Sequence, residues 1–128
     1  MAKLKATPKT YEQAVAALGG RESVKLGNNT YLERASDNTA IFVRLYATDI
    51  VTFFLDGRIT LRTGCYRTAT TKDRINEFVA GRVYQRNHDW YYQDSYDAEG
   101  RPQRERTFTE GMNVGLVRDV RWCFSSRK

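Results

Sequence analysis

The dipeptide Asp56-Gly57, which lies between two apolar runs, constrains the fold of this chain more than any other feature of its sequence. An Asp-Gly pair in such a context predicts a β-hairpin with a type I′ turn, because that turn needs positive φ at both central residues. A two-residue loop pairs Phe54 with Ile59, and directly opposed residues share one face of the sheet. The predicted core face consists of Thr52, Phe54, Ile59 and Leu61. The opposite face carries Val51, Phe53, Leu55, Arg58, Thr60 and Arg62.

The run from Ile41 to Tyr46 precedes this hairpin and alternates with a period of two, as a strand does. Ile41, Val43 and Leu45 fall on one side. Phe42, Arg44 and Tyr46 fall on the other, which mixes aromatic and basic groups. If the mixed faces of the three strands coincide, they form one aromatic-basic surface. Its members are Phe42, Arg44, Tyr46, Phe53, Arg58 and Arg62.

Two short helices are predicted from capping residues and apolar spacing. Thr10 caps a helix over Tyr11–Leu18, which Gly19-Gly20 ends. A second helix begins near Thr70–Thr71, with Thr70 as its N-cap, and ends at Gly81. Its apolar stripe is Ile75, Phe78 and Val79.

The rest of the chain indicates further strands and loops, so we predict a single α+β domain over residues 1–128. Its architecture is an antiparallel sheet of hairpins, with roughly five to seven strands, packed with the two short helices. Residues 1–9 are expected to be a flexible or edge segment, and Ser95–Pro102 a loop. The other extended segments are Arg21–Gly27, Thr30–Arg34, Arg82–Arg86, Trp90–Gln93, Gln103–Thr109 and, as a strand or a short helix, Val117–Phe124.

The composition excludes several classes of function. No P-loop, nucleophile elbow, zinc-protease or dinucleotide motif is present, and the single His88 falls in a turn between two strands. The two cysteines lack CxxC spacing, which argues against a metal site. We therefore expect a non-catalytic protein without metal or cofactor. No apolar run is long enough for a membrane helix, so no membrane association is expected.

The net charge of +6, with aromatic residues interleaved among the arginines, favours binding to nucleic acid. Aromatic rings stack on bases, and arginines hold phosphates. The alternative is that Phe42, Tyr46 and Phe53 form a second core layer with arginines at its rim. The candidate nucleic-acid-binding residues are Phe42, Arg44, Tyr46, Phe53, Arg58, Arg62, Arg67, Lys72 and Arg74.

A second hypothesis is a protein-interaction module, because Trp, Tyr and Arg dominate the binding energy of protein interfaces. The segment after the predicted second helix is rich in these residues. Its candidates are Arg86, Trp90, Tyr91 and Tyr92. Salt separates the two hypotheses, since nucleic-acid affinity falls steeply with salt and a hydrophobic interface resists it.

Three segments of the sequence resemble small uncharacterised proteins of tailed bacteriophages. They are KLGNNTYLER (25–34), TTKDRIN (70–76) after a strand pair joined by DGR (56–58), and VYQRNHDWYYQD (83–94) with EGM (110–112) downstream. The first twenty and last fifteen residues fall outside this resemblance. That family has no established activity, so the resemblance implies only a phage origin and the cytoplasm of an infected bacterium. The first hypothesis then becomes a phage accessory protein that binds nucleic acid. The second becomes an inhibitor or modulator of a host enzyme or defence complex.

Overall fold

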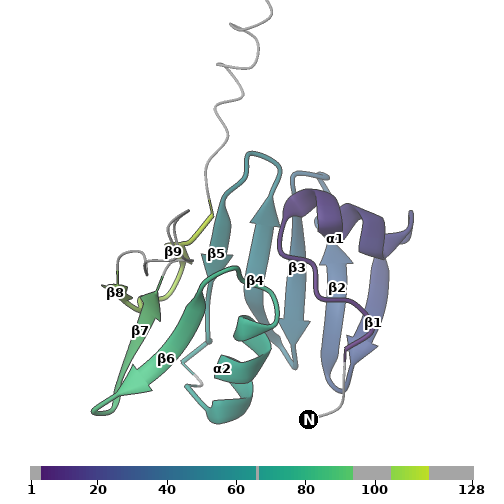
Figure 1. Ribbon diagram of the computed structural model, residues 1–128. Coiled ribbons are helices and arrows are strands. Elements are labelled where there is room, and N and C mark those ends of the chain that lie inside the picture. The colour runs from purple at the N-terminus through teal and green to yellow at the C-terminus, as the bar shows by residue number, and fades with distance from the viewer. Residues whose placement is uncertain (1–3, 66, 94–104, 116–128) are drawn as a thin grey trace, which may run out of the picture.

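The computed structural model describes residues 4–65, 67–93 and 105–115 (Figure 1). Within them the chain forms two helices, α1 (Tyr11–Leu18) and α2 (Ala69–Asn76). The strands are β1 (Ser23–Gly27), β2 (Thr30–Arg34), β3 (Ala40–Leu45), β4 (Thr48–Phe54), β5 (Ile59–Leu61), β6 (Arg82–Arg86), β7 (Asp89–Gln93), β8 (Glu105–Thr107) and β9 (Met112–Asn113). The loop predicted over 95–102 and the element predicted over 117–124 lie outside these residues.

The strands form two antiparallel sheets, which confirms the predicted α+β class. The larger sheet has six strands in the order β1-β2-β3-β4-β5-β9, and the smaller has three in the order β6-β7-β8. The prediction treated these strands as one sheet. In the structure α2 intervenes between β5 and β6, and the chain after it starts the smaller sheet beside the larger one (Figure 1).

Tight turns of two residues join β1 to β2, β3 to β4 and β6 to β7. Asn87 and His88, which join β6 to β7, both have positive φ, as a type I′ turn requires. In the β3–β4 turn the non-glycine residue Tyr46 has a φ of 56°. The backbone N–H of Tyr46 donates to the carbonyl of Asn29 at 2.9 Å, which ties this turn to the β1–β2 turn.

The type I′ turn predicted at Asp56-Gly57 is wrong. Only Gly57 has positive φ (99°), and its N–H donates to the carbonyl of Phe54 at 3.0 Å. The N–H of Phe54 in turn donates to the carbonyl of Arg58. This is a three-residue loop in which a type I turn is followed by a left-handed glycine. Phe53 therefore pairs with Ile59, one residue away from the predicted register.

A shift of one residue moves every side chain of a strand to the other face, so the predicted faces of β4 are exchanged. Ile59 and Leu61 of β5 keep the predicted core side. Phe53, predicted to lie on the aromatic-basic surface, is fully buried in the core opposite Ile41. Phe54, predicted to be a core residue, is half-buried on the other face of the sheet. An irregularity in the β3–β4 pairing leaves Ile50 between two paired positions, and it too is buried.

Helix α1 matches its prediction, since Thr10 is the N-cap and Gly19 ends the helix with φ 60°. Helix α2 begins and ends earlier than predicted. Its N-cap is Thr68, whose side chain accepts from the N–H of Thr71 at 3.2 Å. It ends at Asn76, whose side chain exchanges two hydrogen bonds with the backbone of Val83. These bonds tie the end of α2 to the start of β6, which lies at the predicted position.

One cluster of buried apolar side chains joins both helices and both sheets. Ala14 and Leu18 come from α1, Ile75 from α2, and Trp90 and Tyr92 from the smaller sheet. The segment before α1 also contributes. Leu4 is buried, and the N–H of Lys5 donates to the carbonyl of Leu26 in β1 at 2.9 Å. From there the segment crosses the helix-covered face of the larger sheet (Figure 1), and the Lys9 ammonium donates to the carbonyl of Glu77 at 3.1 Å.

Candidate functional site

Both helices lie over the same face of the six-stranded sheet (Figure 1). The opposite face is called the outer sheet face. It contains half-buried aromatic residues together with charged ones, and of the predicted surface it retains Phe42 and Arg44. Its central members are Tyr31, Glu33, Phe42, Arg44, Thr52 and Phe54.

The central arginine of the outer sheet face is paired with a carboxylate. Arg44 forms an ion pair with Glu33 at 2.8 Å and lies over the ring of Tyr31, 4.9 Å from its centroid. The hydrogen bond with Glu33 raises the pKa of Arg44 above its usual value. Asp49 lies opposite Arg44 in the sheet. Burial raises the pKa of Asp49, and Glu33 raises it further, while Arg44 and Arg62 act in the opposite direction.

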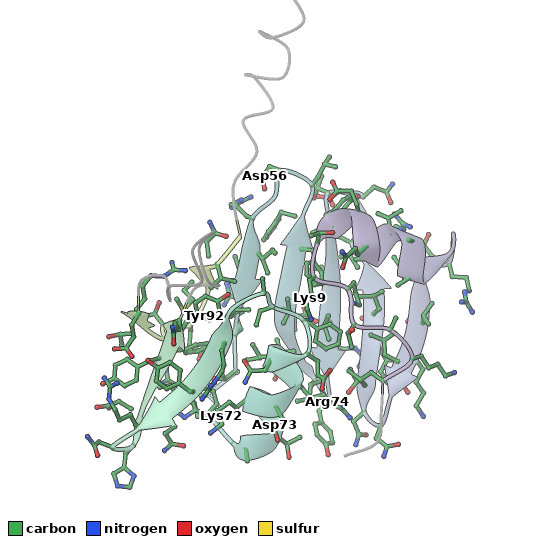
Figure 2. All side chains as sticks on the ribbon, in the orientation of Figure 1. Lys9, Asp56, Lys72, Asp73, Arg74 and Tyr92 are labelled. Carbon is green, nitrogen blue, oxygen red and sulfur yellow. The ribbon has the colours of Figure 1, made fainter. Side chains whose placement is uncertain are left out.

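Arg58 lies at the hairpin end of the sheet. Its guanidinium packs 4.3 Å from the centre of the Phe54 ring and forms an ion pair with Asp56 at 3.0 Å. In Figure 2, Asp56 marks the end of the sheet opposite to α2. Arg58 is therefore far along the sheet from the predicted candidates on α2.

Arg67 and Lys72 lie on a different part of the molecule from Arg44. Both cations approach the ring of Trp90, at 5.7 and 5.8 Å from its centroid. Arg67 also lies 5.2 Å from the ring of Phe108, which contacts Trp90 edge to face. These two residues thus cover an aromatic pair of the core instead of extending the outer sheet face.

Glu110 is hydrogen-bonded to the backbone that follows β5. It was not among the candidates predicted from the sequence. Its carboxylate accepts hydrogen bonds from the backbone N–H of Thr63 at 2.7 Å, from the Thr63 hydroxyl and from the N–H of Gly64. Burial raises the pKa of Glu110, but these hydrogen bonds and the charge of Arg67 outweigh it, so the pKa is lowered overall. Only the EGM string of the resemblance drew attention to this position.

Tyr46 and Arg74 are brought together at the other end of the sheet. They line a hollow of about 240 Å³, which we call the Tyr46–Arg74 site. Its lining consists of Asn28, Asn29, Leu45, Tyr46, Thr70 and Arg74. Tyr46 is 63% exposed, although it is a large aromatic residue in a tight turn. The Arg44 guanidinium donates to its carbonyl at 3.1 Å and helps to fix that turn.

Arg74 is only 4% exposed, and its Nε has no hydrogen-bond partner. No ion pair, hydrogen bond or aromatic contact of its guanidinium occurs within residues 4–65, 67–93 and 105–115. Figure 2 shows Arg74 and Lys72 on opposite sides of α2. The sequence grouped these two residues around the helix start, and the structure separates them.

A second hollow, of about 440 Å³, adjoins the first and shares Leu45, Tyr46 and Thr70 with it. We call it the threonine pocket because the β4 start, the β5 end and the first turn of α2 supply five threonines. Its lining consists of Leu45, Tyr46, Ala47, Thr48, Ile50, Thr63, Thr68, Thr70 and Thr71. This wall is mainly apolar, with hydroxyl groups along it.

The cluster predicted for protein interaction is divided by the alternation of β7. Trp90 and Tyr92 are 3% and 2% exposed and belong to the core, so neither ring is open to a partner protein. The Tyr92 hydroxyl accepts from the N–H of Gly81 at 3.1 Å. Tyr91 and Arg86 stay on the outer side, where the guanidinium lies 4.6 Å from the ring centre.

The described part of the chain contains no group of three or more His, Cys, Asp or Glu side chains arranged to hold a metal ion. His88 is exposed in its turn. None of the described helices is long and apolar enough to cross a membrane.

Comparison with known proteins identifies the family. A family model described as Kyanoviridae Gp96 protein matches residues 7–115. The match begins further towards the N-terminus than the resemblance found in the sequence. Neither the search of curated proteins nor the search of solved structures found a match. Because the family model covers most of the 128 residues, the chain belongs to the Kyanoviridae Gp96 protein family of phage proteins.

Proposed function

We propose that this protein is a non-catalytic phage accessory protein that binds a single strand of nucleic acid in the cytoplasm of the infected host. The observation that carries the proposal is the position of Tyr46. A ring that is 63% exposed is held by a hydrogen-bonded turn at the rim of a hollow that also contains Arg74. An aromatic platform next to a cation is the arrangement that binds an unpaired base and its phosphate.

The energetics favour a strand with unpaired bases. Stacking of a base on an aromatic side chain contributes about 1–3 kcal/mol and tolerates any base, because every base has a π-face. Bases inside a duplex are already stacked and offer no free face to Tyr46. The net charge of +6 adds a favourable, salt-dependent term for any polyanion.

The paired arginines of the outer sheet face make it the weaker candidate surface. Arg44 has Glu33 at 2.8 Å, and Arg58 has Asp56 at 3.0 Å. A phosphate approaching either arginine would have to compete with a carboxylate that is already in contact with it. The proposed site is therefore narrower than the predicted aromatic-basic surface and lies at one end of the sheet.

The test is binding of a fluorescent single-stranded oligonucleotide to wild type, Tyr46→Ala and Leu55→Ala. Leu55 is the matched control, because it is 52% exposed and lies in the turn at the other end of β4. Tyr46→Ala should cost about 1–3 kcal/mol of binding with an unchanged salt slope, since loss of stacking releases no counterions. Leu55→Ala should bind like wild type.

Absence of oligonucleotide retention by wild type at low salt would refute this proposal. An equal loss of oligonucleotide affinity in both variants would show that Tyr46 is not part of the binding site. Their melting temperatures, measured in parallel, show whether either variant has lost stability.

The second candidate function is binding to a host protein, and one observation favours it. The outer side of the smaller sheet carries Tyr84 and Tyr91 with ring centres 5.9 Å apart. Arg82 lies over the first ring and Arg86 over the second. Such Tyr-Arg groups are enriched in protein interfaces. Capture of a bacterial protein that persists after nuclease treatment and is lost in Tyr91→Ala would support this reading.

A further inference from the structure

Arg74 is a buried cation for which the described chain supplies no counter-charge. Its residue is 4% exposed, and its Nε lacks an acceptor. Burial of a charge without a partner is strongly unfavourable even after relaxation of the surroundings. Even the half-exposed Arg44 of the same protein has a carboxylate in contact, that of Glu33. The structure around Arg74 therefore fits an anion that binds from outside the chain.

The side chain of Arg74 is held between two elements, at the wall of a hollow that opens to the surface. The guanidinium lies between α2 and the β1–β2 hairpin, where Nη2 is 3.9 Å from the position that a Cβ on Gly27 would occupy. Asn28 and Asn29 form the turn of that hairpin, and Thr70 lies one helical turn before Arg74 on the same face of α2. Amide and hydroxyl donors thus surround a fixed cation.

We infer that the pocket at Arg74 binds one phosphate group, and that the adjoining threonine pocket holds the nucleoside attached to that phosphate. The planar guanidinium matches a phosphate with two parallel hydrogen bonds. The backbone N–H groups of Ala69 and Thr70 begin α2 without acceptors inside the helix, and Thr70 lines the hollow. A hollow of about 240 Å³ suits a small anionic group, and the mainly apolar hollow beside it suits a ring.

This inference deepens the proposed function, because the assignment of the phosphate to a polynucleotide rests on that function. The anion site at Arg74 does not depend on whether the protein binds nucleic acid. A phosphate group can belong to a nucleic-acid strand or to a free nucleotide, and both present the same chemistry to Arg74. The experiment must therefore compare inorganic phosphate, a nucleoside monophosphate and a single-stranded oligonucleotide.

The test follows the Nε–Hε signal of Arg74 by NMR while each of the three probes is added, and measures the three affinities by calorimetry. The test variant is Arg74→Met, which has a similar length and no charge. The control is Arg82→Met, which removes an equal charge from an exposed arginine on the smaller sheet. We expect all three probes to shift the wild-type Arg74 signal in a saturable way, with the monophosphate binding more tightly than inorganic phosphate. Arg74→Met should lose about tenfold or more in affinity for each probe, and Arg82→Met should keep its affinity for inorganic phosphate and the monophosphate.

Stability gives an independent readout. Without added phosphate, Arg74→Met should melt at or above the wild-type temperature, because it removes an uncompensated buried charge. Phosphate should raise the melting temperature of wild type and of Arg82→Met but not of Arg74→Met. If Arg74→Met is much less stable than wild type without phosphate, the charge has an internal partner and the inference is wrong. If Arg74→Met does not fold, the wild-type NMR titration decides alone.

Failure of the inference and failure of the proposed function give different results. An unmoved Arg74 signal, or equal phosphate affinity in Arg74→Met and wild type, overturns the phosphate site even where the oligonucleotide still binds through Tyr46. Binding of phosphate and monophosphate at Arg74 without retention of the oligonucleotide supports the site and refutes the proposed function. The source of the phosphate is then a free nucleotide.

Discussion

At the scale of single residues, Arg74 and Glu110 differ in whether the described chain supplies partners for a charged side chain. The carboxylate of Glu110 has three hydrogen-bond donors from Thr63 and Gly64, and Arg67 lies 3.8 Å away. The guanidinium of Arg74 is more deeply buried and has no such partner in the described chain. The first arrangement stabilises the fold, whereas the second leaves a charge available for a ligand.

Replacement of Glu110 by Gln should destabilise the protein by about 1–2 kcal/mol at pH 7, because a neutral acceptor forms weaker hydrogen bonds and Gln has one acceptor oxygen instead of two. The loss should depend on pH. The folded-state pKa of Glu110 is lowered, so its contribution is complete above the unfolded-state pKa and is lost as pH falls through the folded-state pKa.

Urea unfolding of wild type and Glu110→Gln across the acidic range measures this difference. The two stabilities should converge at low pH, where the wild-type carboxyl is protonated. Asp49, whose pKa is raised, changes stability in the opposite direction in both proteins and so cancels from the comparison. A difference that stays constant with pH would mean that the charge of Glu110 contributes nothing.

At the scale of elements, the β4–β5 hairpin shows how one loop residue decides which face is buried. Phe53 and Phe54 are adjacent and chemically identical, so the choice between them depends wholly on register. The structure has a three-residue loop with a left-handed Gly57, which places Phe53 opposite Ile59 and inside the core. Phe54 then packs under Arg58 at the surface.

Truncation of the two phenylalanines should therefore have unequal effects. Phe53→Ala should cost about 3–5 kcal/mol, as expected for a large buried aromatic residue. Phe54→Ala should cost about 1 kcal/mol, the scale of one exposed cation–π contact with its partial burial. Chemical denaturation of the two variants measures both values. A larger loss of stability in Phe54→Ala than in Phe53→Ala would favour the two-residue turn and its register.

Substitutions of Gly57 test the loop itself. Its φ of 99° lies in a region that β-branched residues resist and that Asn tolerates better than most residues. The melting temperature should fall in the order Gly57, Gly57→Asn, Gly57→Val. Equal melting temperatures for all three proteins would show that the loop does not need positive φ at this position.

Much of the secondary structure could be predicted from the sequence, because local signals decide it. α1, β2 and β6 have the predicted bounds, since their caps and turns lie within a few residues. The start of α2 was missed because Thr68, Thr70 and Thr71 are all good caps. The register of the hairpin was missed because Asp-Gly fits both a two-residue and a three-residue loop.

The candidate site could be predicted only in part. Tyr46 and Arg74 were both candidates, but they come from separate elements, and their common hollow depends on packing of α2 against the β1–β2 turn. No local pattern shows that Arg44 has a carboxylate in contact, that of Glu33 on the neighbouring strand, while Arg74 has none. Ion pairing across strands needs the register, which the sequence did not settle.

At the scale of the whole molecule, the described chain separates its aromatic and basic residues into distinct places. Arg44 and Phe42 lie on the outer sheet face, Arg67 and Lys72 cover Trp90, and Tyr46 lies with Arg74 at one end of the larger sheet. A single continuous surface, as predicted from alternation alone, does not form. Binding is therefore expected at one end of the sheet and not along the whole of it.

The most direct test of this central claim is an NMR map of wild-type protein as a short single-stranded oligonucleotide is added at low salt. The amide signals of 28–29, 45–48 and 68–74 should move together and saturate. Signals of Tyr84 and Tyr91, on the smaller sheet, should stay in place. No movement at 45–48 and 68–74, or movement centred on Tyr84 and Tyr91, would show that the strand does not bind at the Tyr46–Arg74 site.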